Sequence, residues 1–405
     1  MVVTRLMLKS LDNFGTSFSY LYPCPLEWDK KSGKLTYIRI SMKLIPWILS
    51  VFGGMGSIFI FCAVLLGCQL FGVARLEFSN IVLTMVFLCL AMFAILLEIV
   101  FLFYAESCSH LFNECVLQVK KLGFGHIFTE FPPQLDPLGI ILNLTVATFA
   151  IIPYFMYPFI AYFGLDPFTQ TLHNLLIPSN LAPPPVTYAL TALRFSVVAP
   201  LIQGNRLLSF FTVATTLATH LILTLISILS KATKNVRMSG ISRSVIDIYL
   251  NTYQTVQIIM AGTVEFTAAV TSISMFLAIV MSVLVNFVTL KMYETVPLPF
   301  FAFFPTASVL VVVLIGVMFP MLVDVYENCG EMYARWKYLV GRSVDKKYLT
   351  RRLRAIRVLR FYGGINGYNI YICQRSTKLT YYGVILSYTV SALLSVERKN
   401  VSARE

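Results

Sequence analysis

The fold of this chain is indicated by the stretch LTYYGVILSYTVSALLSV, residues 379–396. It is long enough to cross a membrane once as a helix, and ten Lys and Arg residues lie between Arg335 and Arg360 before it. Its small side chains recur every four positions, at Gly383, Ser387, Ser391 and Ser395. Such a stripe permits close helix packing, or it lines a water-filled path in which Val384 forms an apolar constriction. The spacing leaves both interpretations open.

The composition is that of a membrane protein. Of 405 residues, 57% are hydrophobic and 13% are charged, and the mean hydropathy is +0.76, whereas soluble domains carry about 25% charged residues. The net charge of +13 comes from loops between apolar segments that lack interleaved aromatic residues. We therefore expect contact with lipid headgroups and no binding of nucleic acid.

The apolar segments predict an all-α fold with seven transmembrane helices. The predicted spans are Leu44 to Val73, Ile81 to Ala105, Leu138 to Leu165, Leu207 to Leu229, Val264 to Leu290, Leu298 to Val323 and Leu379 to Val396. Most of the 32 Lys and Arg residues lie before the first span and after the second, fourth and sixth. The positive-inside rule then places the N-terminus in the cytoplasm and the C-terminus outside.

This topology divides the chain into five regions. They are a cytoplasmic N-terminal region (1–43), helices one to six with their loops (44–323), cytoplasmic anchor helices and a linker (324–378), the seventh helix (379–396) and a short extracellular tail (397–405). In the first region, Tyr22 to Lys34 is predicted to be an extended segment and a turn. The long external segment Asp166 to Arg206 is expected to form a stiff lid, and Gly363 to Gly367 a flexible link.

Two groups of residues are candidates for ligand binding. The outer half of the third span is rich in aromatic side chains, at Tyr154, Phe155, Tyr157, Phe159 and Tyr162. These either belong to the aromatic belt of the membrane interface or line a pocket for a small organic molecule. Glu98 lies near the middle of the second span, and it is either a functional carboxylate or a hydrogen-bonded residue that faces other helices.

The seventh span carries a family resemblance. Thr380-Tyr381, five mostly apolar residues, and then Ser387-Tyr388 resemble the C-terminal signature of arthropod gustatory receptors, which is Thr-Tyr, five apolar residues, Gln-Phe. These receptors belong to the insect gustatory and odorant receptor superfamily. Here Ser stands at the Gln position and Tyr at the Phe position.

The resemblance implies a chemosensory receptor of the plasma membrane that acts as a ligand-gated, non-selective cation channel without cofactors. Four identical or related subunits would each contribute the last helix to a central pore, and a small tastant or odorant would open it. The implied pore and gate residues are Gly383, Val384, Ser387, Tyr388 and Ser391.

Two other functions are compatible with the residues alone. A solute transporter would use Glu98, Glu265 and Asn286 in a coupled substrate site, and a membrane scaffold would conduct nothing. The four His residues are scattered and no Cys pair has the spacing of a metal site, so neither a metal centre nor a catalytic site is predicted.

Overall fold

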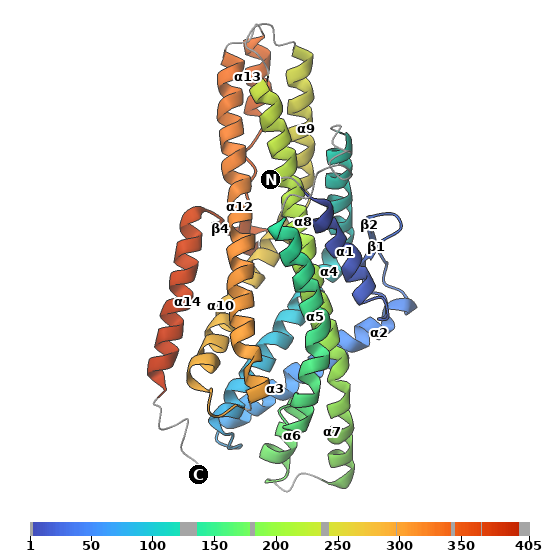
Figure 1. Cartoon of the computed structure of the whole chain (residues 1–405), viewed down its shortest axis with the longest axis vertical. Helices are drawn as coiled ribbons and strands as arrows, with labels where there is room; N and C mark the ends of the chain where they lie inside the picture. The colour runs from blue at the N-terminus through green and yellow to red at the C-terminus, as the bar shows by residue number, and fades with distance from the viewer. Residues whose placement is uncertain are drawn as a thin grey trace.

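A computed structural model describes residues 3–121, 136–178, 183–235, 243–296, 298–341, 345–365 and 367–396. Long helices dominate this part of the chain, and two short hairpins join them (Figure 1). The elements are α1 (Arg5–Ser17), β1 (Leu26–Asp29), β2 (Lys34–Tyr37), η1 (Met42–Leu44), α2 (Ile45–Ile48), η2 (Leu49–Met55), α3 (Gly56–Leu70), α4 (Phe78–Lys121), α5 (Pro137–Tyr162), α6 (Pro167–Thr171), η4 (Leu172–Leu176), α7 (Pro184–Ser196), α8 (Val198–Asn235), α9 (Arg243–Ala261), α10 (Val264–Lys291), α11 (Leu298–Phe301), α12 (Phe303–Gly341), α13 (Lys346–Arg354), β3 (Tyr362–Ile365), β4 (Tyr368–Ile372) and α14 (Arg375–Ser395).

Among the described residues, six helical segments are long and apolar enough to cross a membrane. They are Met42–Leu70, Phe78–Lys121, Pro137–Leu176, Pro184–Lys231, Val264–Lys291 and Phe303–Gly341. The seventh helix, α14, has 21 residues, which gives a length of about 30 Å, the thickness of the hydrocarbon core. Its Tyr, Thr and Ser residues make it less apolar than the other six. The predicted all-α, polytopic membrane fold is confirmed.

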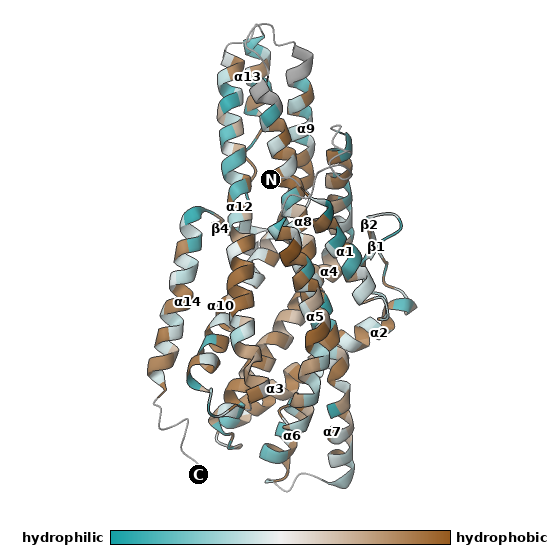
Figure 2. Cartoon of the chain, viewed as in Figure 1, coloured by the Kyte–Doolittle hydropathy of each residue, from teal (hydrophilic) through white to brown (hydrophobic). Residues whose placement is uncertain are grey.

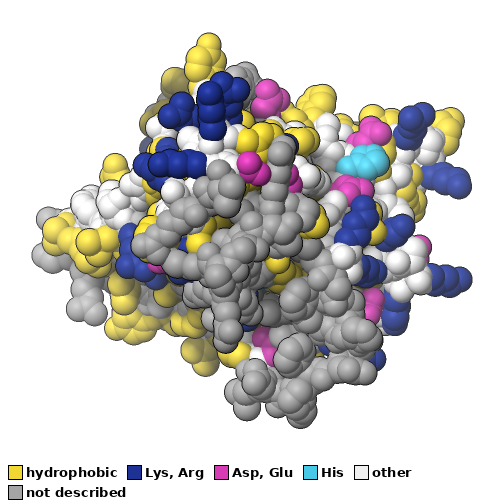
Figure 3. All heavy atoms as spheres, turned by 90° about the horizontal axis from the view of Figure 1, so that it is seen from above, with side chains coloured by type: hydrophobic (Ala, Val, Ile, Leu, Met, Phe, Trp, Pro, Cys, Tyr) yellow, Lys and Arg dark blue, Asp and Glu magenta, His cyan; other side chains and the backbone are white. Residues whose placement is uncertain are grey.

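Helices α8, α9, α12 and α13 continue beyond the apolar part of the bundle to one end of the molecule (Figures 1 and 2). Their inner faces share the main apolar cluster of the protein. Within it, the rings of Tyr253 and Trp336 meet edge to face at 5.4 Å, and the Tyr253 hydroxyl donates to the carbonyl of Arg357 at 2.9 Å. Lys and Arg side chains are visible on several sides of the molecule when it is seen from this end (Figure 3). The positive-inside rule assigns such an end to the cytoplasm, and that assignment stays a prediction.

The N-terminal region contains a helix that the sequence analysis missed. The predicted extended segment and turn are present as the β1–β2 hairpin, in which Leu26 pairs with Tyr37. Before it, however, α1 packs against α5 and α8. Asn143 of α5 fixes the helix, because its side chain donates to the carbonyl of Leu6 at 3.0 Å and accepts from Asn13 at 2.6 Å.

The described residues of the segment Asp166 to Arg206 are mostly helical, and a role of this segment as a stiff lid stays a prediction. Asp166 begins α6 by accepting from the amide of Thr169 at 2.8 Å, and Arg194 of α7 pairs with the same carboxylate at 3.1 Å. Pro183 caps α7, and Pro184 and Pro185 occupy its first turn, where a missing N–H costs nothing. Helix α8 also begins at Val198 and not at Leu207, which places Arg206 inside the bundle.

The expected flexible link before the seventh helix is a β-hairpin. Strands β3 and β4 pair antiparallel, with an irregularity between Gly363 and Gly364. A Cβ at Gly363 would lie 2.1 Å from the Tyr371 ring, and one at Gly364 would lie 2.0 Å from the Tyr368 carbonyl oxygen. These glycines therefore permit close strand contact. The predicted tail, 397–405, lies outside the described residues.

Candidate functional site

Helix α14 lies at the side of the bundle and contacts it mainly through α10 (Figure 1). Its buried side chains are Tyr381 and Thr389, which share one face of the helix at this spacing. The Tyr381 hydroxyl donates to the carbonyl of Met275 on α10 at 2.8 Å, and its ring stacks on Phe319 of α12 at 6.3 Å. The second residue of the Thr-Tyr motif is therefore an anchor for the helix, while Thr380 is exposed.

The other end of α14 is held by a lysine that the sequence analysis left unassigned. Lys291, at the end of α10, donates from Nζ to the carbonyl of Leu393 at 2.7 Å and also to the carbonyl of Val396. These carbonyls belong to the last turn of α14, where helical partners are missing. A cation there also interacts favourably with the helix dipole.

Of the predicted pore residues, Tyr388 follows Tyr381 by seven residues and lies on its side of α14, whereas Gly383, Ser387 and Ser391 lie on the opposite face. Gly383, Ser387, Tyr388 and Ser391 are exposed, and Val384 is partly buried at the edge of this face. A Cβ added at Gly383 would meet no other described atom within 4 Å. Packing inside the subunit therefore does not explain the stripe of small residues among the described parts of the chain. Lipid, water or another subunit could cover this face.

The exposed face of α14 has two halves. Leu386, Val390 and Leu394 are bulky and exposed, and at 100° per residue they lie to one side of Ser387 and Ser391. The apolar half suits lipid or a neighbouring helix, whereas the small and weakly polar half suits water.

The aromatic residues of α5 do not converge on one cavity. Tyr154, Phe155 and Tyr162 are 53%, 55% and 83% exposed, and the Tyr154 hydroxyl bonds to that of Tyr20 at 2.6 Å. Tyr157 and Phe159 instead pack against the second apolar cluster, which α3, α4, α5, α10 and α12 share. A ligand-binding role for these five residues stays a prediction.

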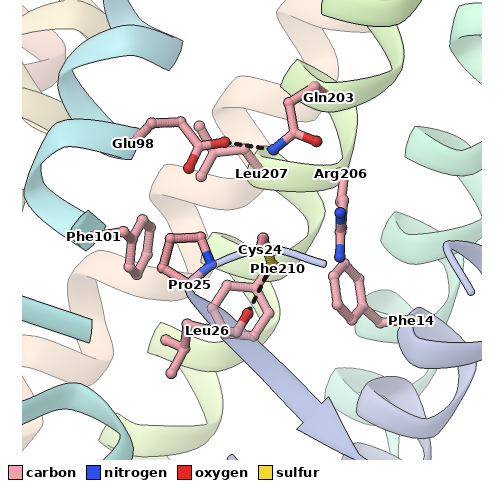
Figure 4. A pocket seen from close by; sticks show the side chains of 10 residues that line it. All are labelled: Phe14, Cys24, Pro25, Leu26, Glu98, Phe101, Gln203, Arg206, Leu207 and Phe210. Atoms are coloured by element: carbon pink, nitrogen blue, oxygen red, sulfur yellow. Dashed lines mark hydrogen bonds between the residues drawn. The ribbon is translucent and has the colours of Figure 1, made fainter. Parts of the chain in front are cut away.

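Glu98 lies in a buried polar cluster that joins α4, α8 and the segment before β1 (Figure 4). Its carboxylate is 3% exposed and accepts from Gln203 Nε2 at 2.6 Å. Next along α8, Arg206 donates to the carbonyl of Tyr22 at 2.7 Å and contacts the Glu27 carboxylate at 3.4 Å. Glu98 therefore has a hydrogen-bonding partner and faces other helices, as one of the two interpretations predicted.

The chemistry of this cluster extends to the N-terminal segment. Cys24 and Leu26 line the same cavity as Glu98 and Gln203, and burial raises the pKa of the Cys24 thiol to about 11. The thiol is therefore protonated at neutral pH and acts as a small apolar group. Gln203 and Arg206 escaped sequence reasoning because their partners lie 105 and 184 positions away along the chain.

The residues suggested for a transporter site have separate partners. Glu265 accepts a long hydrogen bond of 3.5 Å from Tyr104, Asn286 accepts from Ser308 at 2.6 Å, and Glu98 is bound to Gln203. The described part of the chain contains no group of three or more His, Cys, Asp or Glu side chains that could hold a metal ion.

Comparison with known proteins assigns the fold. No protein-family model matches the sequence, and no curated protein matches it. Solved structures similar to this one include two of the insect olfactory receptor OR5 from Machilis hrabei. The structure in complex with eugenol has a TM-score of 0.62 and 11% identity, over 96% of this chain and 98% of that chain. The other has a TM-score of 0.53 and 11% identity, over 96% and 97%. The chain thus has the fold of the insect olfactory receptor structures.

Proposed function

We propose that this protein is a chemosensory receptor that acts as a ligand-gated cation channel, with α14 of each subunit lining the pore. The observation that carries the proposal is the placement of α14. It is fixed to the bundle through one face, at Tyr381 and Lys291, and presents small and weakly polar side chains on the other. A membrane protein keeps such a face when water or a partner subunit covers it.

The pore requires several copies of the chain. Four subunits around one axis would place Ser387 and Ser391 toward the centre and leave Leu386 and Leu394 against lipid or a neighbouring helix. Val384 stands at the edge of the stripe, and a ring of valines at this level would close the path by excluding water. Ser387 is shorter than the Gln that the family signature carries, so the pore would be wider at that level.

The ligand is proposed to be a small organic molecule. One of the similar structures contains eugenol, a compact aromatic molecule of the kind that apolar, aromatic pockets bind. In this chain, Tyr157 and Phe159 pack against an apolar cluster that five membrane helices share. A ligand inserted there would change the packing between α5, α10 and α12, and α10 holds both ends of α14.

Whole-cell recording from cells that express this chain alone tests the proposal. We expect a cation current evoked by eugenol or by a compound from a panel of tastants and odorants. Val384→Ala is expected to raise the ligand-independent current, because a smaller side chain widens the constriction. Val390→Ala is the matched control, since six residues place it about 120° around the helix from Val384. Surface biotinylation confirms equal delivery to the plasma membrane.

Two results would contradict the proposal. Equal effects of Val384→Ala and Val390→Ala would remove Val384 from the pore. A surface-expressed chain that is silent alone and with related receptor subunits, yet accumulates a labelled solute, would support the transporter. Ser387→Gln, which restores the family residue, is expected to alter ion permeation without changing surface expression.

A further inference from the structure

A small cavity lies beside Glu98, between α4, α8 and the segment before β1 (Figure 4). Polar and apolar side chains line it together, among them Cys24, Glu98, Phe101, Gln203, Arg206 and Phe210. Its volume is about 20 Å³, which is room for one water molecule. Pockets for organic ligands have volumes of about 300 Å³ or more, so an odorant is not the occupant.

Two polar atoms of residues that line the cavity have no hydrogen-bond partner among the described residues. Gln203 Oε1 and Arg206 Nε are buried and have no partner among the described residues. Their residues are only 2% and 6% exposed, although Gln203 Nε2 and the other two Arg206 nitrogens are bonded. One unpaired acceptor and one unpaired donor thus lie on the same stretch of α8, one helical turn apart. Buried groups of this kind are rarely left without a partner.

We propose that one ordered water molecule occupies this cavity, donating to Gln203 Oε1 and accepting from Arg206 Nε. Its second hydrogen is available to the Glu98 carboxylate, whose oxygen Oε1 already accepts from Gln203. The site meets the requirements for a buried water, because it is polar, has sufficient room and offers two to four partners. A cation in place of the water would face the Arg206 guanidinium, and the charge of that side chain opposes it.

The water completes a hydrogen-bonded chain that we call the N-terminal clamp, formed by Tyr22, Glu27, Glu98, Gln203 and Arg206. Without the water, Gln203 is tied to α4 and Arg206 to the N-terminal segment, as two separate pairs. With it, the two pairs become one network that fixes the segment 22–27 to α4 and α8 together. Because Gln203 and Arg206 are buried and little solvent reaches them, breaking this network at one point is expected to loosen the segment.

The experiment combines a structure determination with amide exchange on the full-length protein in nanodiscs. A map that resolves ordered waters is expected to show one density within hydrogen-bonding distance of both Gln203 Oε1 and Arg206 Nε. Gln203→Met keeps the length of the side chain and removes its polar atoms. We expect this variant to lose the density and to exchange the amides of Cys24 and Leu26 about tenfold faster.

Thr215→Val is the control, because the Thr215 hydroxyl donates to the carbonyl of Phe211 in its own helix. It is expected to leave the exchange of the segment 22–27 unchanged. An empty cavity in a map that resolves waters elsewhere would overturn the proposal, as would a density too large for water. Unchanged exchange in Gln203→Met would overturn the clamp. If that variant fails to fold, the wild-type map still decides whether the water is present.

Discussion

Lys291 is expected to determine how firmly the lower end of α14 is held. Its Nζ donates to the carbonyls of Leu393 and Val396, and hydrogen bonds from a charged donor contribute about 1.5–3 kcal/mol each. Lys291 is partly buried, and water can replace some of this interaction. We therefore expect Lys291→Met to cost about 2 kcal/mol locally, which is roughly a 30-fold change in the opening equilibrium of the last turn.

Hydrogen–deuterium exchange of the protein in nanodiscs measures this change directly. In Lys291→Met the amides of residues 392–395 are expected to exchange roughly 30-fold faster, while those around Tyr381 keep their wild-type rates. Lys291→Arg is the control, because it retains a cationic donor and should stay within a few-fold of wild type. Wild-type exchange in Lys291→Met would refute the assignment of Lys291 as the attachment of α14.

Three further predictions concern other parts of the fold. Gly364→Ala is expected to destabilise the protein by about 1–3 kcal/mol, because the new Cβ would lie 2.0 Å from a backbone oxygen. The control Gly330→Ala in α12 has open space around it and should be neutral or slightly stabilising. Thermal unfolding in detergent compares the two variants, and equal unfolding midpoints would contradict the close hairpin contact. Arg194→Met leaves the buried Asp166 carboxylate without its cation and is expected to lower the free energy of unfolding by about 2 kcal/mol. This is below the range for fully buried ion pairs because Arg194 is partly exposed. Thermal unfolding should show a smaller loss of stability for Arg194→Lys. Burial raises the pKa of Cys373 to about 11, so its thiol stays protonated at pH 7.5. It should therefore react with maleimide about 100-fold more slowly than the exposed thiol of Ser376→Cys. Equal labelling rates measured by mass spectrometry would show that Cys373 is accessible.

The fold was readable from the sequence where one strong physical rule applied. Runs of about 20 apolar residues are required to cross a membrane, so the first, third and fifth spans were placed within a few residues at both ends. The second and sixth begin near the predicted residues, but α4 and α12 continue past the predicted ends to Lys121 and Gly341. The seventh was found although its Ser, Thr and Tyr residues make it weakly apolar. Its small stripe at Gly383, Ser387 and Ser391 was also correctly expected to share one face, because helical spacing alone determines this.

Local sequence patterns did not predict the structure where contacts between distant segments determine it. No helix was predicted between Asp166 and Arg206, yet proline is suited to the first turn of a helix, and α7 begins at Pro184. The predicted fourth span began at Leu207 and so left out Gln203 and Arg206, which α8 contains. The partners of these two residues, Glu98 and the carbonyl of Tyr22, come from distant parts of the chain and leave no local signal.

The candidate site could be predicted only in part because local sequence gives no information on contacts with distant segments. Helical periodicity gives the face on which a residue lies but not what covers that face. For α14 the structure removes one alternative for the described residues, since a side chain at Gly383 would meet no described atom and Ser387 and Ser391 are exposed. A helix that is anchored at both ends and uncovered between them must be covered by something outside the chain. Lipid alone is a poor partner for the weakly polar half of this face, so water and further subunits are the partners that the sequence of α14 favours.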